Sequence, residues 1–389
     1  MKLRLIAAVL ALSLCGLLAC SSRSTTQSQN GTGTVYLVTQ GNTAVSTYTV
    51  SLSNGALSSV GATLSTGNSP VALAITPSLN ALFIANSGSN NISSYTLSGN
   101  AGLTAGSSTA TGGTIPMGLA VDPAGKFLFV ANEASSNISV FSINGAALSK
   151  VAGSPFTTIP GGSTTPTDPV AVAVSPSGKW LYVANQSANN ISVFSIASSG
   201  ALAPVVALPN SAGLGPTGLA IPASGAFLYV ANAGSNNVSA FSICDKVVTS
   251  CANPNAPDGT LHEVSGSPFP AGQTPVAIAI DPSFGFLYVL DKGSNEVSQY
   301  SYATGTGVLT VLSPGTVATG LTPTGFAIIG GATGTNAGNT LTNPQDYMFV
   351  ANNGASTLSS FALNTTTGQL TTLGLAVTTE NNPSAVGAN

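Results

Sequence analysis

The amino-acid sequence predicts an all-β chain, a seven-bladed β-propeller of four-stranded antiparallel blades. Three observations support this prediction: a phrase repeated seven times, apolar residues that alternate with a period of two, and chain ends that complement each other. The phrase is an apolar strand opening with proline, a turn, and an aromatic-aliphatic strand. Its seven copies end at Gln40, Asn86, Asn132, Asn185, Asn232, Asp291 and Asn352. Recurrence of this kind is the signature of a repeat architecture.

One unit illustrates how the strands arise. Residues 71–75 are apolar throughout, as expected for a strand buried on both faces. A proline-containing turn leads to a second buried strand over 81–85, and an Asn-rich bend leads to an alternating strand over 92–97. Residues 103–111 are more polar and predict an outer strand. Burial is therefore expected to fall from the first strand to the fourth, as in blades around an axis.

The two ends of the chain together supply one blade. The first unit starts near Thr34 and lacks an opening strand, whereas residues 383–389 resemble an opening strand with nothing after it. Pairing the two would close the ring and remove the exposed edges of an open array. The predicted propeller domain is residues 34–389.

Two copies of the phrase carry a family resemblance. Residues 122–132 and 175–185 each continue through a Ser-Asn or Asn-Asn bend into an Ile-Ser-Val-Phe-Ser-Ile strand. This pattern resembles the YVTN-type repeat and the seven-bladed lactonase-like propeller family, which includes bacterial 6-phosphogluconolactonase. The resemblance covers about residues 34–389 and implies the fold. Because the matching residues are scaffold residues, it implies the family's lactone-opening reaction only as one alternative.

The N-terminal residues 1–19 have the pattern of a bacterial lipoprotein signal peptide. Lys2 and Arg4 precede an apolar run over 5–18 that is too short for a membrane span. Leu17-Leu18-Ala19-Cys20 resembles a lipobox, with Cys20 as the lipidated residue. The alternative is an ordinary secretory signal with an incidental cysteine.

Residues 20–33 are rich in Ser, Thr, Gln, Asn and Gly and are expected to form a flexible tether. Ser21 and Ser22, with no aspartate after Cys20, favour sorting to the outer membrane. We therefore expect an exported protein of the bacterial envelope, held to the membrane by its N-terminal lipid.

The remaining cysteines agree with export. Cys244 and Cys251 lie in an insert after the third strand of the fifth unit and predict a disulfide. On chain-entropy grounds it would stabilise the fold by roughly 2–3 kcal/mol. The alternative is a metal site, but two cysteines and one distant histidine are too few ligands for closed zinc coordination.

The composition limits the chemistry. Only 5% of the residues are charged and the net charge is −3, so a nucleic-acid surface is not expected. No arginine follows Arg23, although recognition of phosphorylated sugar acids usually uses Arg or Lys clusters. No residue pattern indicates a cofactor or a metal, and we expect a monomer.

The last residues of the seven repeated phrases are predicted to form a ring on one face of the propeller. Alternate turns of an antiparallel sheet lie at the same end of the strands, so the turns after all the second strands share one face. The ring comprises Gln40, Asn86, Asn132, Asn185, Asn232, Asp291 and Asn352. One interpretation is structural, with side chains that cap turns or bind neighbouring blades. The other is a polar rim that binds a sugar or a peptide at the mouth of the channel.

Residues that break the repeat are the candidates for catalysis. Asp291 replaces the repeated asparagine, and Glu133 follows it in the third unit. Asp168 and Glu380 are expected on the same face, where carboxylates could act as acid and base. The only histidine, His262, lies at the start of an outer strand. Solvated surface charges and an exposed outer-strand histidine are the structural alternatives.

Two functions follow as expectations. The first is a surface- or periplasm-anchored binding or scaffold module for an envelope glycan, peptide or protein, which agrees with the tether, the low charge and the sparse catalytic equipment. The alternative is a lactone hydrolase resembling 6-phosphogluconolactonase, in which Asp291, Glu133 or His262 would activate water. Whether the chain is an enzyme is left open by the sequence.

Overall fold

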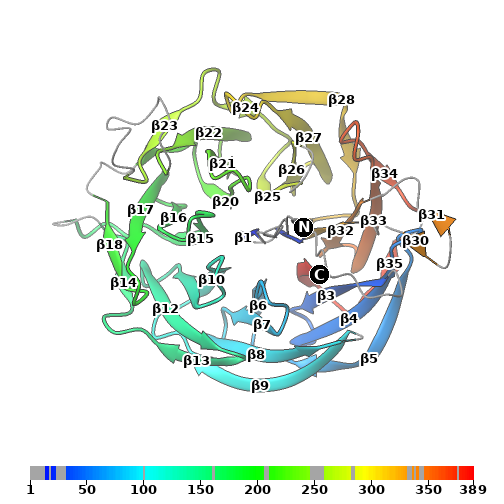
Figure 1. The fold of residues 1–389 in the computed structure, drawn as a ribbon, viewed down its shortest axis with the longest axis horizontal. Helices are drawn as coiled ribbons and strands as arrows, with labels where there is room; N and C mark the ends of the chain where they lie inside the picture. The colour runs from blue at the N-terminus through cyan, green and yellow to red at the C-terminus, as the bar shows by residue number, and fades with distance from the viewer. Residues whose placement is uncertain are drawn as a thin grey trace, which may run out of the picture.

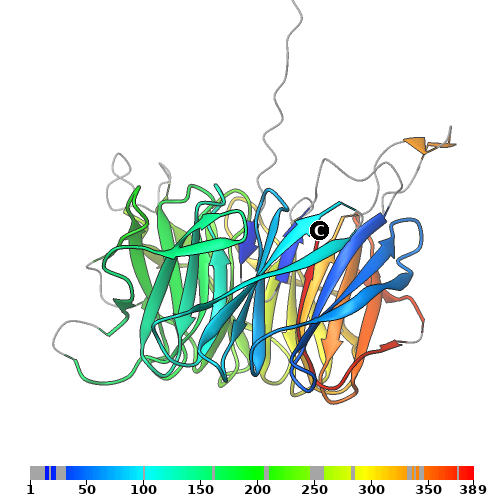
Figure 2. The ribbon, with the colours of Figure 1, turned by 90° about the horizontal axis from the view of Figure 1, so that it is seen from below.

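Seven blades stand around a central axis in the computed structural model (Figure 1), and their strands run roughly along that axis (Figure 2). The structure describes residues 32–99, 101–159, 163–205, 210–245, 258–281, 285–330, 346–374 and 376–389, and the backbone of four short strands outside these ranges. Within these ranges every regular element is a strand. No helix among the described residues is long and apolar enough to cross a membrane.

Each blade runs from an inner strand beside the axis to an outer strand at the rim. Blade 1 contains β36 (Pro383–Ala388), β3 (Thr32–Thr39), β4 (Ala44–Ser51) and β5 (Leu57–Ser65). Blade 2 contains β6 (Pro70–Ile75), β7 (Ala81–Asn86), β8 (Asn91–Ser98) and β9 (Gly102–Ala110). Blade 3 contains β10 (Pro116–Val121), β11 (Phe127–Asn132), β12 (Asn137–Asn144), β13 (Ala147–Lys150) and β14 (Phe156–Thr157). Blade 4 contains β15 (Pro169–Val174), β16 (Trp180–Asn185), β17 (Asn190–Ile196), β18 (Leu202–Pro204) and β19 (Asn210–Ser211).

The remaining blades follow the same order. Blade 5 contains β20 (Pro216–Ala220), β21 (Phe227–Asn232), β22 (Asn237–Ile243), β23 (Leu261–Glu263) and β24 (Phe269–Pro270). Blade 6 contains β25 (Pro275–Ile280), β26 (Phe286–Asp291), β27 (Glu296–Tyr302) and β28 (Leu309–Ala318). Blade 7 contains β29 (Pro323–Ile329), β32 (Asp346–Asn352), β33 (Thr357–Leu363), β34 (Leu370–Thr372) and β35 (Val377–Thr378). In blades 3, 4, 5 and 7 two short strands share the position of the fourth strand.

The predicted fall of burial across a blade is confirmed. Strand β7 is buried along its whole length, whereas β9 is mostly exposed. Small residues let neighbouring inner strands approach closely: a Cβ added at Gly218 would lie 3.3 Å from the Cα of Ala277 in the next blade. The apolar core is therefore a ring of layers between adjacent blades, as expected when sheets pack face to face.

The predicted closure is also confirmed. Strand β36 pairs antiparallel with β3, from Val35 opposite Ala388 to Thr39 opposite Pro383. The backbone nitrogens of Thr34 and Asn389 each donate to the other residue's carbonyl oxygen at 3.0 Å. The first and last segments of the propeller thus complete one blade and leave no open edge at the junction.

The register of β3 corrects the alignment of the first unit. Thr39 lies opposite Pro383 just as Asn86 lies opposite Pro70, so Thr39, and not Gln40, occupies the position of the repeated asparagine. Its hydroxyl donates to the carbonyl oxygen of Ala44 within the blade. Gln40 is the residue after this position. The sequence misplaced this position because neither Thr39 nor Gln40 is the Asn that marks five of the other six copies.

On one face, tyrosines of the second strands link several neighbouring blades through hydrogen bonds. Tyr182 donates its hydroxyl hydrogen to the carbonyl oxygen of Gly259 at 3.0 Å. Tyr229 and Tyr288 repeat this bond with Gly307 and Gly368 at 2.9 and 2.7 Å. These bonds lie at the ends of the blades where the first strand turns into the second.

Two short pairs of strands lie outside the blades. Strands β1 (Leu14–Gly16) and β2 (Ala19–Ser22) form a hairpin near the axis (Figure 1), and β2 pairs in parallel with β29, with Ser21 opposite Ile328. Strands β30 (Thr335–Asn336) and β31 (Asn339–Thr340) pair with each other. The other residues of the expected signal peptide and tether up to residue 31 lie outside the described ranges.

The predicted disulfide is only half described. Cys244 follows β22, is fully buried, and donates its backbone N–H to the carbonyl oxygen of Thr260 at 2.9 Å. Cys251 lies outside the described residues. The pairing of Cys244 with Cys251 therefore stays a prediction.

Candidate functional site

A bulge at the start of every inner strand turns one side chain toward the axis. In β6, Pro70 lies opposite Asn86 and Ala72 opposite Ala85, so Val71 has no partner of its own in the ladder. The same shift of register occurs at the start of the other six inner strands. Bulges re-aim side chains and are frequent beside active sites. The seven re-aimed residues are Val71, Met117, Val170, Thr217, Val276, Thr324 and Ser384.

A second ring of side chains comes from the residue after each second strand. Each such residue begins the turn to the third strand on the same face, and the ring comprises Gln40, Ser87, Glu133, Gln186, Ala233, Lys292 and Asn353. The turn is held by its backbone: Lys292 donates its N–H to the carbonyl oxygen of Thr274 at 3.0 Å, and Glu133 to that of Ile115 at 2.9 Å. Ser87 and Asn353 also donate from their side chains, to the carbonyl oxygens of Ser69 and Pro383 at 2.9 and 3.2 Å.

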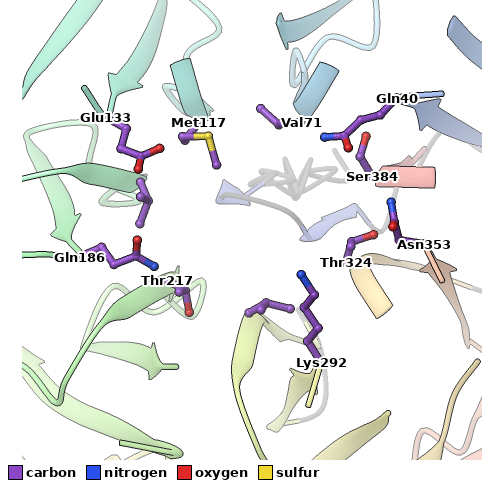
Figure 3. Close-up of a pocket in the computed structure, with 12 residues that line it drawn as sticks. Gln40, Val71, Met117, Glu133, Gln186, Thr217, Lys292, Thr324, Asn353 and Ser384 are labelled. Atoms are coloured by element: carbon purple, nitrogen blue, oxygen red, sulfur yellow. The ribbon is translucent and has the colours of Figure 1, made fainter. Parts of the chain in front are cut away.

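The two rings enclose a pocket of about 410 Å³ at the mouth of the central channel. Figure 3 shows Glu133, Met117 and Gln186 on one side of it, and Gln40, Ser384, Thr324 and Asn353 on the other. Its lining comprises Gln40, Val71, Met117, Glu133, Val170, Gln186, Thr217, Val276, Lys292, Thr324, Asn353 and Ser384. Every blade contributes to this lining, so the pocket exists only because the ring is closed.

The pocket has one acidic and one basic lining residue. Glu133 and Lys292 belong to blades three positions apart in the ring, and the ammonium group of Lys292 points toward the centre of the pocket (Figure 3). Within the described part of the chain, neither side chain forms an ion pair or a hydrogen bond. Unused polar groups in a concave site are the groups expected to meet a ligand.

Two features of its environment raise the pKa of Glu133. Burial raises the pKa of its carboxyl group above the ordinary 4.5, and the negative charge of Asp168 raises it further. Asp168 precedes β15 in the next blade and accepts a hydrogen bond from Ser187. A carboxylate with a raised pKa is a better general base than an ordinary one.

The ring of asparagines lies one residue away from the pocket lining and is fully buried. Asn132 donates from Nδ2 to Asn137 Oδ1 and to Ser139 Oγ, both at 2.8 Å. The same bonding from Nδ2 recurs at Asn86, Asn185, Asn232 and Asn352. These side chains tie the second strand to the third within one blade. The pocket is lined by the residues that follow them.

Asp291 occupies the buried asparagine position in blade 6. Its Oδ2 accepts a hydrogen bond from Ser298 Oγ at 2.6 Å, and its Oδ1 is buried without a hydrogen-bond partner. Burial raises the pKa of Asp291 from 3.8 to about 7; the bond from Ser298 lowers it, and the charge of Glu296 raises it. Asp291 directly precedes Lys292 in the sequence, but its side chain is buried and does not line the pocket.

The other sequence candidates are scattered. His262 is exposed on the outer strand β23, remote from the axis in blade 5. Asp168 lies beside Glu133, as its effect on the pKa of Glu133 indicates, whereas Glu380 acts on Tyr48 in blade 1. No three His, Cys, Asp or Glu side chains of the described ranges gather in a way that could hold a metal ion.

The sequence analysis singled out Glu133 but not most of the pocket. Gln186, Asn353 and the bulged residues were missed. The available signal was variability: within a strict repeat, the position after the asparagine holds Ser87, Glu133, Gln186, Ala233, Lys292 and Asn353. The bulged position varies in the same way between Val, Met, Thr and Ser. The scaffold positions of the repeat are thus nearly constant, whereas the two positions that face the pocket vary.

The closed ring and its pocket define the class of protein: a seven-bladed propeller with a pocket at the mouth of its central channel. The model of the family "Lactonase, 7-bladed beta-propeller" matches residues 22–106, 72–150 and 147–249, which together span more than half of the chain. The chain belongs to this family. No curated protein matches it.

Solved structures agree with this fold. A candidate 6-phosphogluconolactonase of Bacteroides uniformis has a TM-score of 0.73 at 19% identity, over 92% of this chain and 100% of that one. A similar protein of Bacteroides fragilis has a TM-score of 0.73 at 20% identity, over 93% and 99%. The periplasmic gluconolactonase of Pseudomonas aeruginosa has a TM-score of 0.71 at 21% identity, over 92% and 99%. At these identities the likeness shows the fold alone.

Proposed function

We propose that the protein hydrolyses a sugar lactone in the pocket at the mouth of its central channel. The observation that carries this proposal is the presence of Glu133 and Lys292 in one pocket, each without an internal partner in the described structure. The family and the printed activities of the structural neighbours support a lactone as the substrate. They support this alternative better than the binding or scaffold module that the sequence favoured.

The reaction needs a base and a group that stabilises negative charge. Glu133 accepts a proton from water as the water oxygen attacks the lactone carbonyl carbon. Lys292 stabilises the negative charge that develops on the carbonyl oxygen. The bond between the carbonyl carbon and the ring oxygen then breaks, and the ring oxygen leaves as a hydroxyl with the proton returned by Glu133. The product is an open-chain sugar acid, which loses its proton to solvent.

The test is hydrolysis of a panel of sugar lactones by the purified protein, with the spontaneous rate subtracted. Glu133→Gln keeps the size of the side chain but cannot accept the proton, so kcat is expected to fall by about 100-fold or more. Lys292→Gln is expected to lower kcat by about tenfold or more.

Matched controls are available far from the pocket. Glu263→Gln removes an exposed carboxylate from outer strand β23, and Lys126→Gln removes an exposed ammonium from the turn between β10 and β11. Both are expected to keep the wild-type rate. A background rate for the wild-type protein on every lactone would refute the proposal, and capture of an envelope glycan or peptide by the same pocket would then favour a binding module.

A further inference from the structure

We infer that the pocket selects a sugar lactone without a phosphate group. This inference rests on the proposed function and adds the class of substrate. It comes from the direction of the hydrogen bonds around the pocket, which leaves its lining rich in acceptors. A sugar hydroxyl can donate to such a lining, whereas an ionised phosphate group only accepts.

Three hydroxyl groups of the lining already donate hydrogen bonds to backbone carbonyl oxygens. Thr217 donates to the carbonyl oxygen of Pro275 at 2.8 Å, Thr324 to that of Pro383 at 2.9 Å, and Ser384 to that of Pro70 at 2.7 Å. Each bond joins a bulged residue to the first residue of the inner strand in the next blade. Because a hydroxyl has a single hydrogen, these oxygens present only lone pairs to a ligand.

Backbone N–H groups of the described rim residues are also engaged. Five lining residues that follow second strands use their N–H groups to hold the turns. The bonds run from Gln40 to Asn382, Glu133 to Ile115, Gln186 to Asp168, Lys292 to Thr274 and Asn353 to Thr322, at 2.9 to 3.0 Å. Phosphate sites commonly rely on converging backbone N–H groups, and here these groups are occupied.

Positive charge is scarce at the pocket. Lys292 is the one basic residue of its lining, and Glu133 is present to repel a dianion. Lys126 and Lys179 lie in turns between first and second strands, at the opposite ends of the blades. The sequence has no arginine after Arg23, so the bidentate clamp that usually holds a phosphate group is missing.

The donors that remain suit a neutral polyol. The side-chain amides of Gln40 and Gln186 form no hydrogen bond within the described ranges, and each offers both N–H donors and an acceptor oxygen. Val71, Met117 and Val170, from three consecutive blades, form an apolar arc that can pack on the C–H face of a sugar ring. Together these groups match hydroxyls and ring carbons, not a phosphate.

The test compares D-glucono-1,5-lactone with its 6-phosphate. We expect kcat/KM to be at least about tenfold higher for the lactone without phosphate, since the pocket would offer a desolvated phosphate too few donors and too little positive charge. Gln186→Lys adds a cation to the lining without breaking an internal bond. It is expected to raise kcat/KM for the 6-phosphate relative to the unphosphorylated lactone by about tenfold. Thr104→Lys, on the exposed outer strand β9, adds the same charge elsewhere and should leave the ratio unchanged.

The outcomes are distinct. A wild-type preference for the 6-phosphate, or an equal shift of the ratio by Gln186→Lys and Thr104→Lys, would overturn the selectivity while leaving lactone hydrolysis in place. Hydrolysis of neither lactone above background would remove the proposed function, and the selectivity with it.

Discussion

Ser298 donates its hydroxyl hydrogen to Asp291 at 2.6 Å, whereas the equivalent Ser139 accepts a hydrogen bond from Asn132 at 2.8 Å. The replacement of Asn by Asp therefore reverses the bond between the second and third strands of blade 6. The strand pair keeps its link, but an ionisable group is now buried where five other blades hold a neutral amide.

This reversal predicts a pH-dependent loss of stability. The folded pKa of Asp291 is about 7, above the ordinary 3.8, so its favourable contribution is fully present below about pH 4 and is lost as pH rises toward 7. Asp291→Asn restores the neutral amide. The gain in unfolding free energy over wild type should grow by on the order of 3 kcal/mol from pH 4 to pH 8. Urea unfolding at both pH values measures it.

The reverse substitution is the control. Asn352 makes the ordinary bonds of this position in blade 7, to Thr357 and Ser359. Asn352→Asp should destabilise the protein more at pH 8 than at pH 4. If the stability of wild type and Asp291→Asn differed by the same amount at both pH values, a raised pKa for Asp291 would be ruled out.

A second prediction concerns the pH dependence of hydrolysis. Glu133 must be ionised to accept a proton, and burial together with Asp168 raises its pKa. The acidic limb of kcat/KM should therefore lie at a higher pH than an ordinary glutamate would give. Asp168→Asn removes the neighbouring charge, so the limb should move toward lower pH. Steady-state rates corrected for spontaneous hydrolysis measure this shift.

The control for this shift is Glu380→Gln. Glu380 acts on Tyr48 in blade 1 and does not contribute to the pKa of Glu133. It should leave the acidic limb in place. A limb that Asp168→Asn does not move would argue that a group other than Glu133 is the base.

A third prediction tests the closure of the ring. Val386 lies opposite Leu37 in the junction between β36 and β3 and is 1% exposed. Val386→Asp would bury an unpaired charge there and should lower the unfolding free energy by several kcal/mol, with loss of the pocket. Val377→Asp on outer strand β35 is the matched control, since Val377 is 36% exposed. Equal melting temperatures for the two variants would contradict the conclusion that the pairing of β36 with β3 stabilises the propeller.

The sequence predicted the fold well because the fold is repeated. Seven copies of one pattern average out local ambiguity, and the missing strand before Thr34 reappears at residues 383–389. The pocket was harder to predict, because it depends on bulges that leave no mark on hydrophobic periodicity. A one-residue offset decides whether a side chain is buried like Asn132 or faces the pocket like Glu133. That offset, set by the pairing of β10 with β11, is a property of the register and not of composition.

The last prediction concerns the membrane anchor that the N-terminal sequence indicates. We propose that Cys20 carries a lipid. Cys20→Ala should then release the protein from the membrane fraction and abolish incorporation of labelled palmitate, whereas Cys15→Ala should change neither.

Strand β3 begins at Thr32, at the end of blade 1 that lies opposite Gln40 and the pocket. A tether over 20–33 would therefore hold the protein by the far face, so the anchored form should hydrolyse lactones with the same KM as the released Cys20→Ala form. Retention of Cys20→Ala in the membrane fraction would contradict the anchor, and a raised KM for the anchored form would contradict this orientation.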